Sequence, residues 1–119
     1  MDAADSIRTR ILNSKIPVIA FVDNNAASAG ALISIACNEI YMRSGASMGA
    51  ATVVDANAAV LPDKYHSYML AMMRTTAEKK GRDPKIAEAM VDPRTYIPGV
   101  NDSAKVLTFT TTESITNGY

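Results

Sequence analysis

Apolar residues along the first third of the chain predict a helix, a strand and a second helix. Apolar positions recur at helical spacing over residues 3–13, with arginines between them. Residues 16–22 form an apolar run, which predicts a strand buried on both faces, as in a parallel sheet. The run ends at a polar turn over residues 23–25, and a helix follows over residues 28–37. Because this helix has hardly any polar face, we expect it to be central and buried.

The middle of the chain contains the clearest helical pattern. A short strand is predicted at residues 40–42, followed by a segment of small residues, 44–51, with neither helical nor strand periodicity. We interpret residues 53–62 as a loop. The helix after this loop has an apolar stripe at i, i+3, i+4, i+7 and i+8. The stripe comprises Tyr65, Tyr68, Met69, Met72, Met73 and Ala77.

The last third continues the alternation of helices and strands. Gly81 ends the long helix, and a shorter helix over residues 84–90 begins with Asp83 as its N-cap. A strand is predicted at residues 105–109 and a helix from residue 112. The alternation predicts an α/β fold with a parallel sheet and flanking helices.

The composition is that of one small domain or a piece of a larger one. The 119 residues carry 12 Lys and Arg against 12 Asp and Glu, so no net field favours nucleic acid as a partner. We interpret the single cysteine, Cys37, as a small buried hydrophobic residue. No apolar run is long enough to span a bilayer, and the acidic start lacks the features of a signal peptide. We therefore expect this chain to be soluble by itself, and both of its ends to be cut rather than natural.

Ser28 lies where the first apolar run, after its polar turn, gives way to the buried helix. A strand-turn-helix corner can present a serine hydroxyl and direct the backbone N–H groups that follow it toward one spot. Acyl-transfer enzymes use this arrangement for a nucleophile and its oxyanion donor. A serine that opens a helix is more often an N-cap, and the sequence leaves both interpretations open.

A serine nucleophile needs a base, and two residues are candidates. His66, the single histidine, lies inside the long helix, and no carboxylate near it in sequence has a spacing that would orient it. We interpret it as a partly exposed helix residue. Lys64 opens the same helix beside Tyr65 and Tyr68. A lysine there is most often solvated, but cover by its aromatic neighbours would favour the neutral amine that a base requires.

The remaining motifs indicate neither a metal nor a cofactor. No Cys/His spacing suits zinc, no acidic loop suits calcium, and no glycine loop has the spacing that binds phosphates. The segment of small residues at 44–51 contains Gly49, for which we favour close packing of backbone against backbone.

Four segments resemble the Clp-protease/crotonase superfold: residues 17–22, 26–31, 40–42 and 45–50. Within it the chain is most similar to the membrane-bound serine protease domain of NfeD-type proteins, the partners of stomatin-like proteins. That family uses a Ser-Lys dyad. Its serine lies in an Ala-Ser-Ala-Gly motif, which Ser28 matches, and its lysine follows a flexible loop and opens the next long helix, which Lys64 matches.

Further details agree with this resemblance. Segments 78–83 and 87–92 also look like the family, so the resemblance covers nearly the whole chain. Soluble Clp proteases carry a catalytic histidine shortly after the serine helix, and residues 40–62 contain none. Crotonase-type acyl-CoA enzymes share the corner but usually carry glycines where Ser28 and Ala29 stand.

The resemblance implies that residues 1–119 are a partial Clp-like serine protease domain. Ala29, Gly30, Gly49 and Ala50 are then its oxyanion and substrate-binding residues, beside the catalytic Ser28 and Lys64. An extended hydrophobic peptide is expected to add as a strand along a sheet edge near residues 47–51. The expected partners are this peptide substrate, a stomatin-like protein and further copies of the chain. The parent protein is expected to be membrane-bound, with this domain outside the cytoplasm.

One element of the family pattern is missing. The family takes its second oxyanion N–H from a Gly-Gly turn that would lie before Met1, and the final strand and helix would lie beyond Tyr119. Because losing one oxyanion donor typically costs about 10²–10³ in turnover, we expect the isolated chain to be nearly inactive. Two alternatives remain: a non-catalytic oligomerisation module of the same fold, and a crotonase-type acyl-CoA enzyme.

Overall fold

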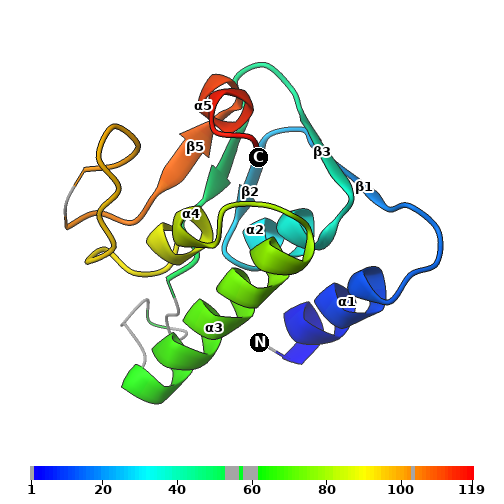
Figure 1. Ribbon diagram of the computed structural model, residues 1–119, viewed down its shortest axis with the longest axis horizontal. Coiled ribbons are helices and arrows are strands. Elements are labelled where there is room, and N and C mark those ends of the chain that lie inside the picture. The colour runs from blue at the N-terminus through cyan, green and yellow to red at the C-terminus, as the bar shows by residue number, and fades with distance from the viewer. Residues whose placement is uncertain (1, 53–56, 58–61, 103) are drawn as a thin grey trace.

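The structure is a computed structural model that describes residues 2–52, 57, 62–102 and 104–119. Short strands and helices alternate along these residues (Figure 1). The elements are α1 (Asp2–Leu12), β1 (Ile19–Val22), β2 (Asn25–Ala27), α2 (Ala29–Ala36), β3 (Glu39–Met42), β4 (Ser47–Gly49), α3 (Asp63–Lys79), α4 (Pro84–Ala89), β5 (Thr108–Thr110) and α5 (Thr111–Thr116).

The strands form two small sheets. β1 pairs with β3 in parallel, so that Ile19 lies opposite Glu39 and Phe21 opposite Tyr41. β2 pairs in parallel with β4, and β4 pairs on its other side with β5, which runs antiparallel. The predicted α/β fold is confirmed, and its parallel pairing holds for two of these three strand pairs. The direction of β5 was not predictable, because an apolar pattern reports which face is buried but not which way a strand runs.

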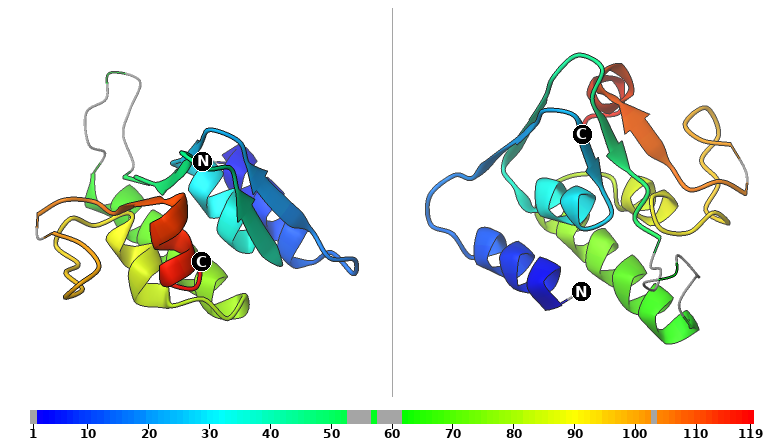
Figure 2. Two further views of the ribbon diagram at one scale, coloured as in Figure 1. Left: turned by 90° about the horizontal axis from the view of Figure 1, so that it is seen from above. Right: turned by 180° about the vertical axis from the view of Figure 1, so that it is seen from behind.

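Helix α2 forms the centre of the core, as its sequence predicts. It packs against α1 and α3 and against strands β2 and β4 (Figures 1 and 2). Leu32 and Ile35 of α2 are fully enclosed, as are Met73 of α3 and Phe109 of β5. Cys37 follows the helix and is buried as predicted, and this burial raises the pKa of its thiol.

Two strands were not predicted, and both matter for the candidate site. β2 lies inside the segment expected to be a polar turn followed directly by a helix. β4 lies inside the segment of small residues expected to have no regular structure. Each strand has three residues, which is too short for an alternating pattern to be recognised.

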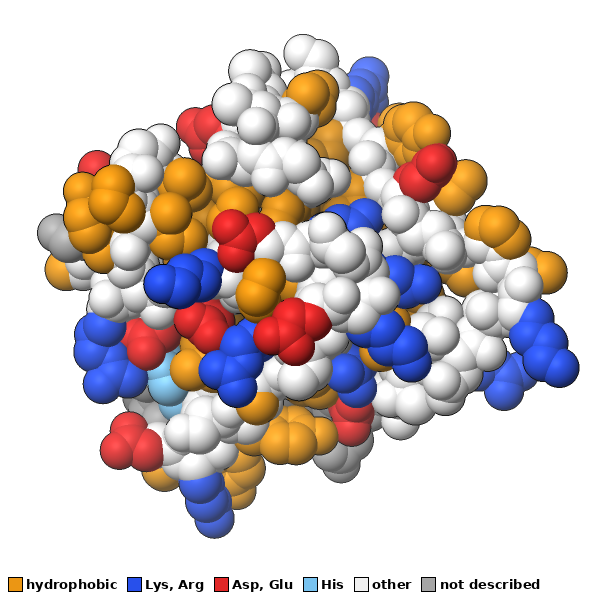
Figure 3. Space-filling model, in the orientation of Figure 1, with side chains coloured by type: hydrophobic (Ala, Val, Ile, Leu, Met, Phe, Trp, Pro, Cys, Tyr) orange, Lys and Arg blue, Asp and Glu red, His pale blue; other side chains and the backbone are white. Residues whose placement is uncertain are grey.

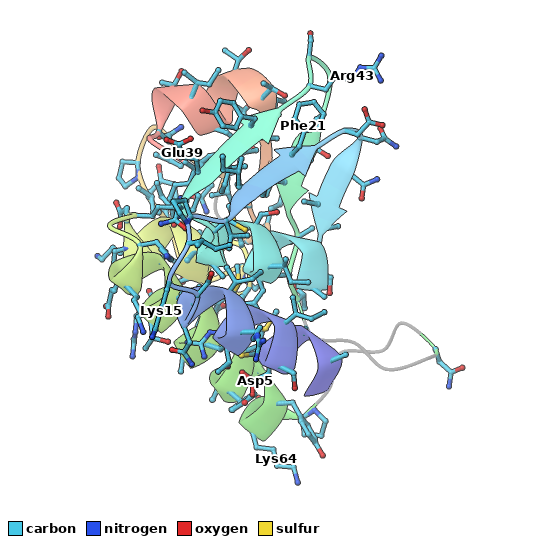
Figure 4. All side chains as sticks on the ribbon, turned by 90° about the vertical axis from the view of Figure 1, so that its right-hand side faces the viewer. Asp5, Lys15, Phe21, Glu39, Arg43 and Lys64 are labelled. Atoms are coloured by element: carbon cyan, nitrogen blue, oxygen red, sulfur yellow. The ribbon has the colours of Figure 1, made fainter. Side chains whose placement is uncertain are left out.

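Strand β1 is not buried on both faces, and this prediction was wrong. Ile19 is 56% exposed and Phe21 is 68% exposed, and Tyr41 of the neighbouring β3 is 53% exposed. Figure 4 shows Phe21 on the outer side of this sheet, and Figure 3 shows apolar side chains at the surface on the side of β1 and β3. No helix of the described part of the chain covers this face. An apolar run therefore predicted the strand correctly but not the number of its covered faces.

The long helix α3 is confirmed, with one correction. Met69, Met72, Met73 and Ala77 of the predicted stripe are buried. The other two residues of the stripe, in the first two turns of the helix, are not buried: Tyr65 is 43% exposed and Tyr68 is 51% exposed. Of the predicted loop at 53–62, only residues 57 and 62 lie within the described residues. Among the described helices, none combines the length and the apolar character needed to cross a membrane.

Arg82 fixes the end of α2, a role that the sequence did not reveal. Its guanidinium donates to the backbone oxygens of Ile35 and Cys37, each at 3.0 Å. These carbonyls lie at the C-terminal end of α2, where backbone oxygens have no N–H partner within the helix. Burial lowers the pKa of Arg82, but its positive charge is favourable at the negative end of a helix dipole. Arg82 thereby anchors the helix that carries Ser28 at its other end.

Candidate active site

Ser28 adopts a backbone conformation that is rare for a residue with a side chain. Its φ is 54° and its ψ is −120°, at the sharp corner between β2 and α2. Such a conformation stores about 1–3 kcal/mol of strain and persists only where the surroundings enforce it. The side chain is exposed and makes no capping hydrogen bond to α2, although the residue occupies the N-cap position. The hydroxyl is therefore not used as a helix cap.

The corner is held by the strand beside it. Ala27 lies opposite Gly49 in the pairing of β2 with β4. The backbone N–H of Ser28 donates to the carbonyl oxygens of Gly49 at 3.1 Å and Ala50 at 3.3 Å. The N–H of Ala50 donates to the oxygen of Leu107, so it is already engaged. Gly49 and Ala50 therefore contact Ser28 through carbonyls that accept from it, and their expected role in binding substrate or oxyanion stays a prediction.

Close backbone packing at Gly49 is confirmed and explains why this position is a glycine. Its φ is +138°, and a Cβ there would lie 2.4 Å from the carbonyl oxygen of Leu107 and 2.9 Å from Cα of Thr108. No side chain fits between the two backbones. The glycine thus lets β5 approach β4 beside the serine corner.

The start of α2 carries the residues for which the family resemblance implies an oxyanion role. Ala29 and Gly30 are its first two residues, and N–H groups at the start of a helix have no intrahelical partner. Among the described residues outside the helix, none accepts a hydrogen bond from these two groups. The positive end of the helix dipole adds to their attraction for a negative oxygen.

Lys64 does not join this group in the described arrangement. It lies in the first turn of α3 and is exposed, and its side chain projects away from the body of the molecule (Figure 4). Its Nζ lies 5.0 Å from the centre of the Tyr65 ring. No hydrogen bond joins it to Ser28, although both residues are described. The aromatic cover that would favour a neutral amine is not formed, because Tyr65 and Tyr68 are themselves half exposed.

His66 has a carboxylate neighbour that sequence spacing could not show. Its Nε2 lies 3.5 Å from Oδ2 of Asp92, which follows α4 in the chain. Asp92 is buried, and Arg94 binds its carboxylate with Nε and a terminal guanidinium nitrogen. The hydrogen bonds from the Arg94 side chain lower the pKa of Asp92 to about 2, although burial of the carboxyl acts in the opposite direction. The backbone N–H of Arg94 and the His66 side chain lower this pKa further by smaller amounts. Because His66 and Asp92 are 26 residues apart in sequence, only the fold reveals the contact.

The expected position of a substrate strand has to be corrected. β4 lies between β2 and β5, so both edges of residues 47–49 are already paired within this chain. Among the described sheets, β1 and β2 are outer strands with one unpaired edge each. They line an open groove of about 590 Å³ that also includes Gly30 and Ile33 of α2.

These features define a class before any relative is considered. An α/β fold that presents an uncapped, strained serine at the start of a buried helix agrees with the Clp-protease/crotonase-like fold that the family resemblance implies. Over residues 1–119 the chain matches the family described as NfeD1b, N-terminal domain. It therefore belongs to the NfeD1b family, and the predicted resemblance is confirmed.

Two curated relatives are membrane proteins by name. Membrane protein NfeD1b of Bacillus subtilis (strain 168) is 47% identical over 83 residues, which cover 70% of this chain and 19% of the relative. Membrane-bound protease PH1510 of Pyrococcus horikoshii is 36% identical over 98 residues, which cover 76% of this chain and 22% of the relative. The chain thus spans about a fifth of the length of these relatives.

Solved structures confirm the fold. A serine-to-alanine variant of the membrane-bound stomatin-specific protease 1510-N matches with a TM-score of 0.81 at 30% identity, over 98% of this chain and 55% of that chain. A lysine-to-alanine variant of 1510-N in complex with a substrate peptide matches with a TM-score of 0.80 at 30% identity, over 98% of this chain and 52% of that chain. The chain therefore belongs to a family that includes named proteases.

Proposed function

We propose that the protein that carries this chain is a serine endopeptidase in which Ser28 is the nucleophile and Lys64 the general base. The observation that carries the proposal is the strained conformation of Ser28, with an exposed hydroxyl that caps nothing. A serine that served only the helix would use its hydroxyl as a cap and would need no positive φ. The solved relatives add support, because the two variants replace a serine and a lysine of a protease.

In the proposed reaction the neutral amine of Lys64 takes the proton of the Ser28 hydroxyl. At the same time the Ser28 oxygen forms a bond to the peptide carbonyl carbon. The N–H of Ala29, with that of Gly30 beside it, stabilises the resulting oxyanion. Collapse of this intermediate breaks the peptide C–N bond, and Lys64 returns the proton to the departing amine. Water then attacks the ester carbon while Lys64 takes a proton from it. Collapse of this second intermediate breaks the C–O bond to Ser28, and Lys64 returns the proton to the serine oxygen as the acid is released.

This chemistry requires Lys64 to approach Ser28. A base has to lie within about 3 Å of the proton that it removes, and such contacts often form only in the substrate complex. The described Lys64 side chain rests over Tyr65. We propose that it turns from this ring toward Ser28 when a peptide occupies the site.

The proposed substrates are hydrophobic peptide segments of membrane-associated proteins. The support is indirect: one solved relative is named a stomatin-specific protease, and another contains a substrate peptide. We propose that a stomatin-like protein is a substrate or partner here too, that the domain lies outside the cytoplasm, and that copies of it associate. We further propose that residues 1–119 are part of the peptidase domain, and that these residues by themselves are nearly inactive, because the Gly-Gly turn that the family resemblance implies is not among them.

The test is cleavage of hydrophobic peptides by the complete natural polypeptide and its variants. Ser28→Ala and Lys64→Ala are both expected to lower kcat by at least about 10³-fold, because each removes one half of the dyad. Lys79→Ala, which removes an exposed lysine at the other end of α3, is the matched control and should cleave normally. A serine-reactive fluorophosphonate should label the wild type but not Ser28→Ala. Cleavage at the wild-type rate by Ser28→Ala or Lys64→Ala would exclude the dyad.

One observation favours a second candidate, a non-catalytic assembly module. Ile19, Phe21 and Tyr41 together expose an apolar face on the β1–β3 sheet, and a second copy could cover it. Sedimentation of wild type and Phe21→Ser at several concentrations measures this association. Loss of association in Phe21→Ser, combined with no labelling of Ser28, would favour the module over the peptidase.

A further inference from the structure

A polar contact joins the second turn of α3 to the segment after α4. The His66 side chain is 15% exposed, and its Nε2 is enclosed and has no hydrogen-bond partner among the described residues. The nearest acidic group is Asp92, whose Oδ2 lies 3.5 Å away. At this distance the contact is weak as a hydrogen bond, but the ring lies within close electrostatic reach of the carboxylate.

Asp92 is a fixed partner in this contact. Its Oδ1 accepts from the backbone N–H of Arg94 at 2.8 Å and from Nε of the same residue at 3.0 Å. Its Oδ2 accepts from a terminal guanidinium nitrogen of Arg94 at 2.9 Å. A carboxylate bound at both oxygens is restrained in its orientation, so His66 faces a negative group that Arg94 holds in place.

The segment around Asp92 also holds the chain that leaves the serine corner. The N–H of Ala51 donates to the oxygen of Met90 at 2.7 Å, and the hydroxyl of Thr52 donates to the oxygen of Val91 at 3.1 Å. Residues 90–92 therefore contact both sides of the candidate site. One side is the strand end beside Ser28, and the other is the start of α3.

The contact with His66 lies close to Lys64. The two residues are two positions apart on α3, which corresponds to about 3 Å along the helix axis. Another polar link between α3 and the α4 region, Arg74 to Glu88 at 3.1 Å, lies eight residues further along α3 than His66, or about 12 Å. Tyr65 is half exposed, so apolar cover does little to fix the first turn.

We propose that Asp92, through His66, is a positioning residue that fixes the first turns of α3 and so presents Lys64 to Ser28. This proposal rests on the proposed Ser28–Lys64 dyad. Asp92 and His66 do not touch the reacting atoms. Their effect is on the fraction of time in which the amine of Lys64 is within reach of the serine hydroxyl.

The experiment is peptide cleavage by the complete natural polypeptide with changes at either end of the contact. His66→Leu and Asp92→Asn should each lower kcat about tenfold and leave KM within about twofold, because a displaced base slows the chemical step but not substrate binding. His66→Gln should keep most of the wild-type kcat, since its amide keeps a polar N–H group beside Asp92. Glu88→Gln, which breaks the Arg74 link between the same parts of the chain, should leave kcat unchanged.

The outcomes separate positioning from stability. Equal kcat values for His66→Leu and the wild type would overturn the proposal, and so would a loss in Glu88→Gln as large as that in His66→Leu. If Asp92→Asn does not fold, the comparison of His66→Leu with His66→Gln decides alone. Failure of the dyad gives a different result, because Lys64→Ala would then cleave at the wild-type rate. Inactive Lys64→Ala together with fully active His66→Leu would retain the dyad and reject the positioning role.

Discussion

Ser28 combines an exposed hydroxyl with a backbone conformation that side chains rarely adopt. Its position is enforced by the two carbonyls of Gly49 and Ala50, which accept from its N–H, and by the buried helix that begins with the next residue. Strain maintained in this way costs stability, and natural sequences retain such strain mainly at functional sites. The strain at this residue therefore supports the proposed role of Ser28, and it can be measured without a substrate.

Comparison of Ser28→Gly with Ser28→Ala measures this strain. Both variants lack the hydroxyl, but only glycine adopts a φ of 54° without steric cost. We expect Ser28→Gly to be more stable than Ser28→Ala by about 1 kcal/mol, although glycine normally destabilises a folded chain through unfolded-state entropy. Urea unfolding of the two variants gives the difference in the free energy of unfolding. A more stable Ser28→Ala would mean that the corner is not strained.

At the scale of elements, two glycines that border the serine corner have opposite roles. Gly30, inside α2, has ordinary space around it, since an added Cβ would lie 3.5 Å from Cβ of Ala26. Gly49, at the end of β4, has the backbone of β5 against it. The same substitution at each therefore separates a helix residue from a residue that two strands need in order to meet.

Gly30→Ala is expected to raise the free energy of unfolding by about 0.5–1 kcal/mol, because alanine is the better helix former and no atom has to move. It should also keep peptidase activity, since it retains the backbone N–H. Gly49→Ala is expected to lower the free energy of unfolding by more than about 3 kcal/mol, because its Cβ would overlap a backbone that cannot yield. Thermal unfolding of both variants checks the pair, and a Gly49→Ala protein with wild-type stability would contradict the packing of β4 on β5.

The sequence predicted the elements with a strong period and missed those without one. The helices α1, α2, α3 and α4 were recognised from apolar spacing and from caps such as Asp83, whose side chain accepts from the N–H of Lys85. β2 and β4 were missed because three residues show no period and because both strands consist mostly of small or polar residues. The exposure of β1 was missed because an apolar run does not reveal whether another element covers it.

The candidate site was predictable to a similar extent. Ser28 and the helix start that follows it were indicated by a local strand-turn-helix pattern, and local patterns are what a sequence reports. Other contacts of the site join elements that are close in space but far apart in sequence. Examples are the contacts of Gly49 and Ala50 with Ser28, and of Asp92 with His66. The pairing of Lys64 with Ser28 came from the family resemblance, and it stays a prediction.

At the scale of the whole molecule, Asp92 links the stability of the fold to pH. Its pKa is about 2 in the folded protein, mainly because of the Arg94 hydrogen bonds, and about 3.9 when unfolded. A group whose pKa is lower when folded stabilises the fold at any pH above its unfolded value. That contribution is lost as pH falls from about 4 through 2, where the folded carboxylate finally takes up its proton.

Asp92→Asn should remove this dependence. At pH 7 we expect the variant to be about 1 kcal/mol less stable than the wild type, a modest value because the Arg94 side chain is largely exposed. The difference should shrink below pH 4 and become small near pH 2, where about half of the wild-type carboxylate is protonated. Asp23→Asn breaks the exposed ion pair with Arg43 and is the matched control. Urea unfolding between pH 7 and pH 2 measures both variants, and a difference for Asp92→Asn that stays constant over this range would show that its charge does not stabilise the fold.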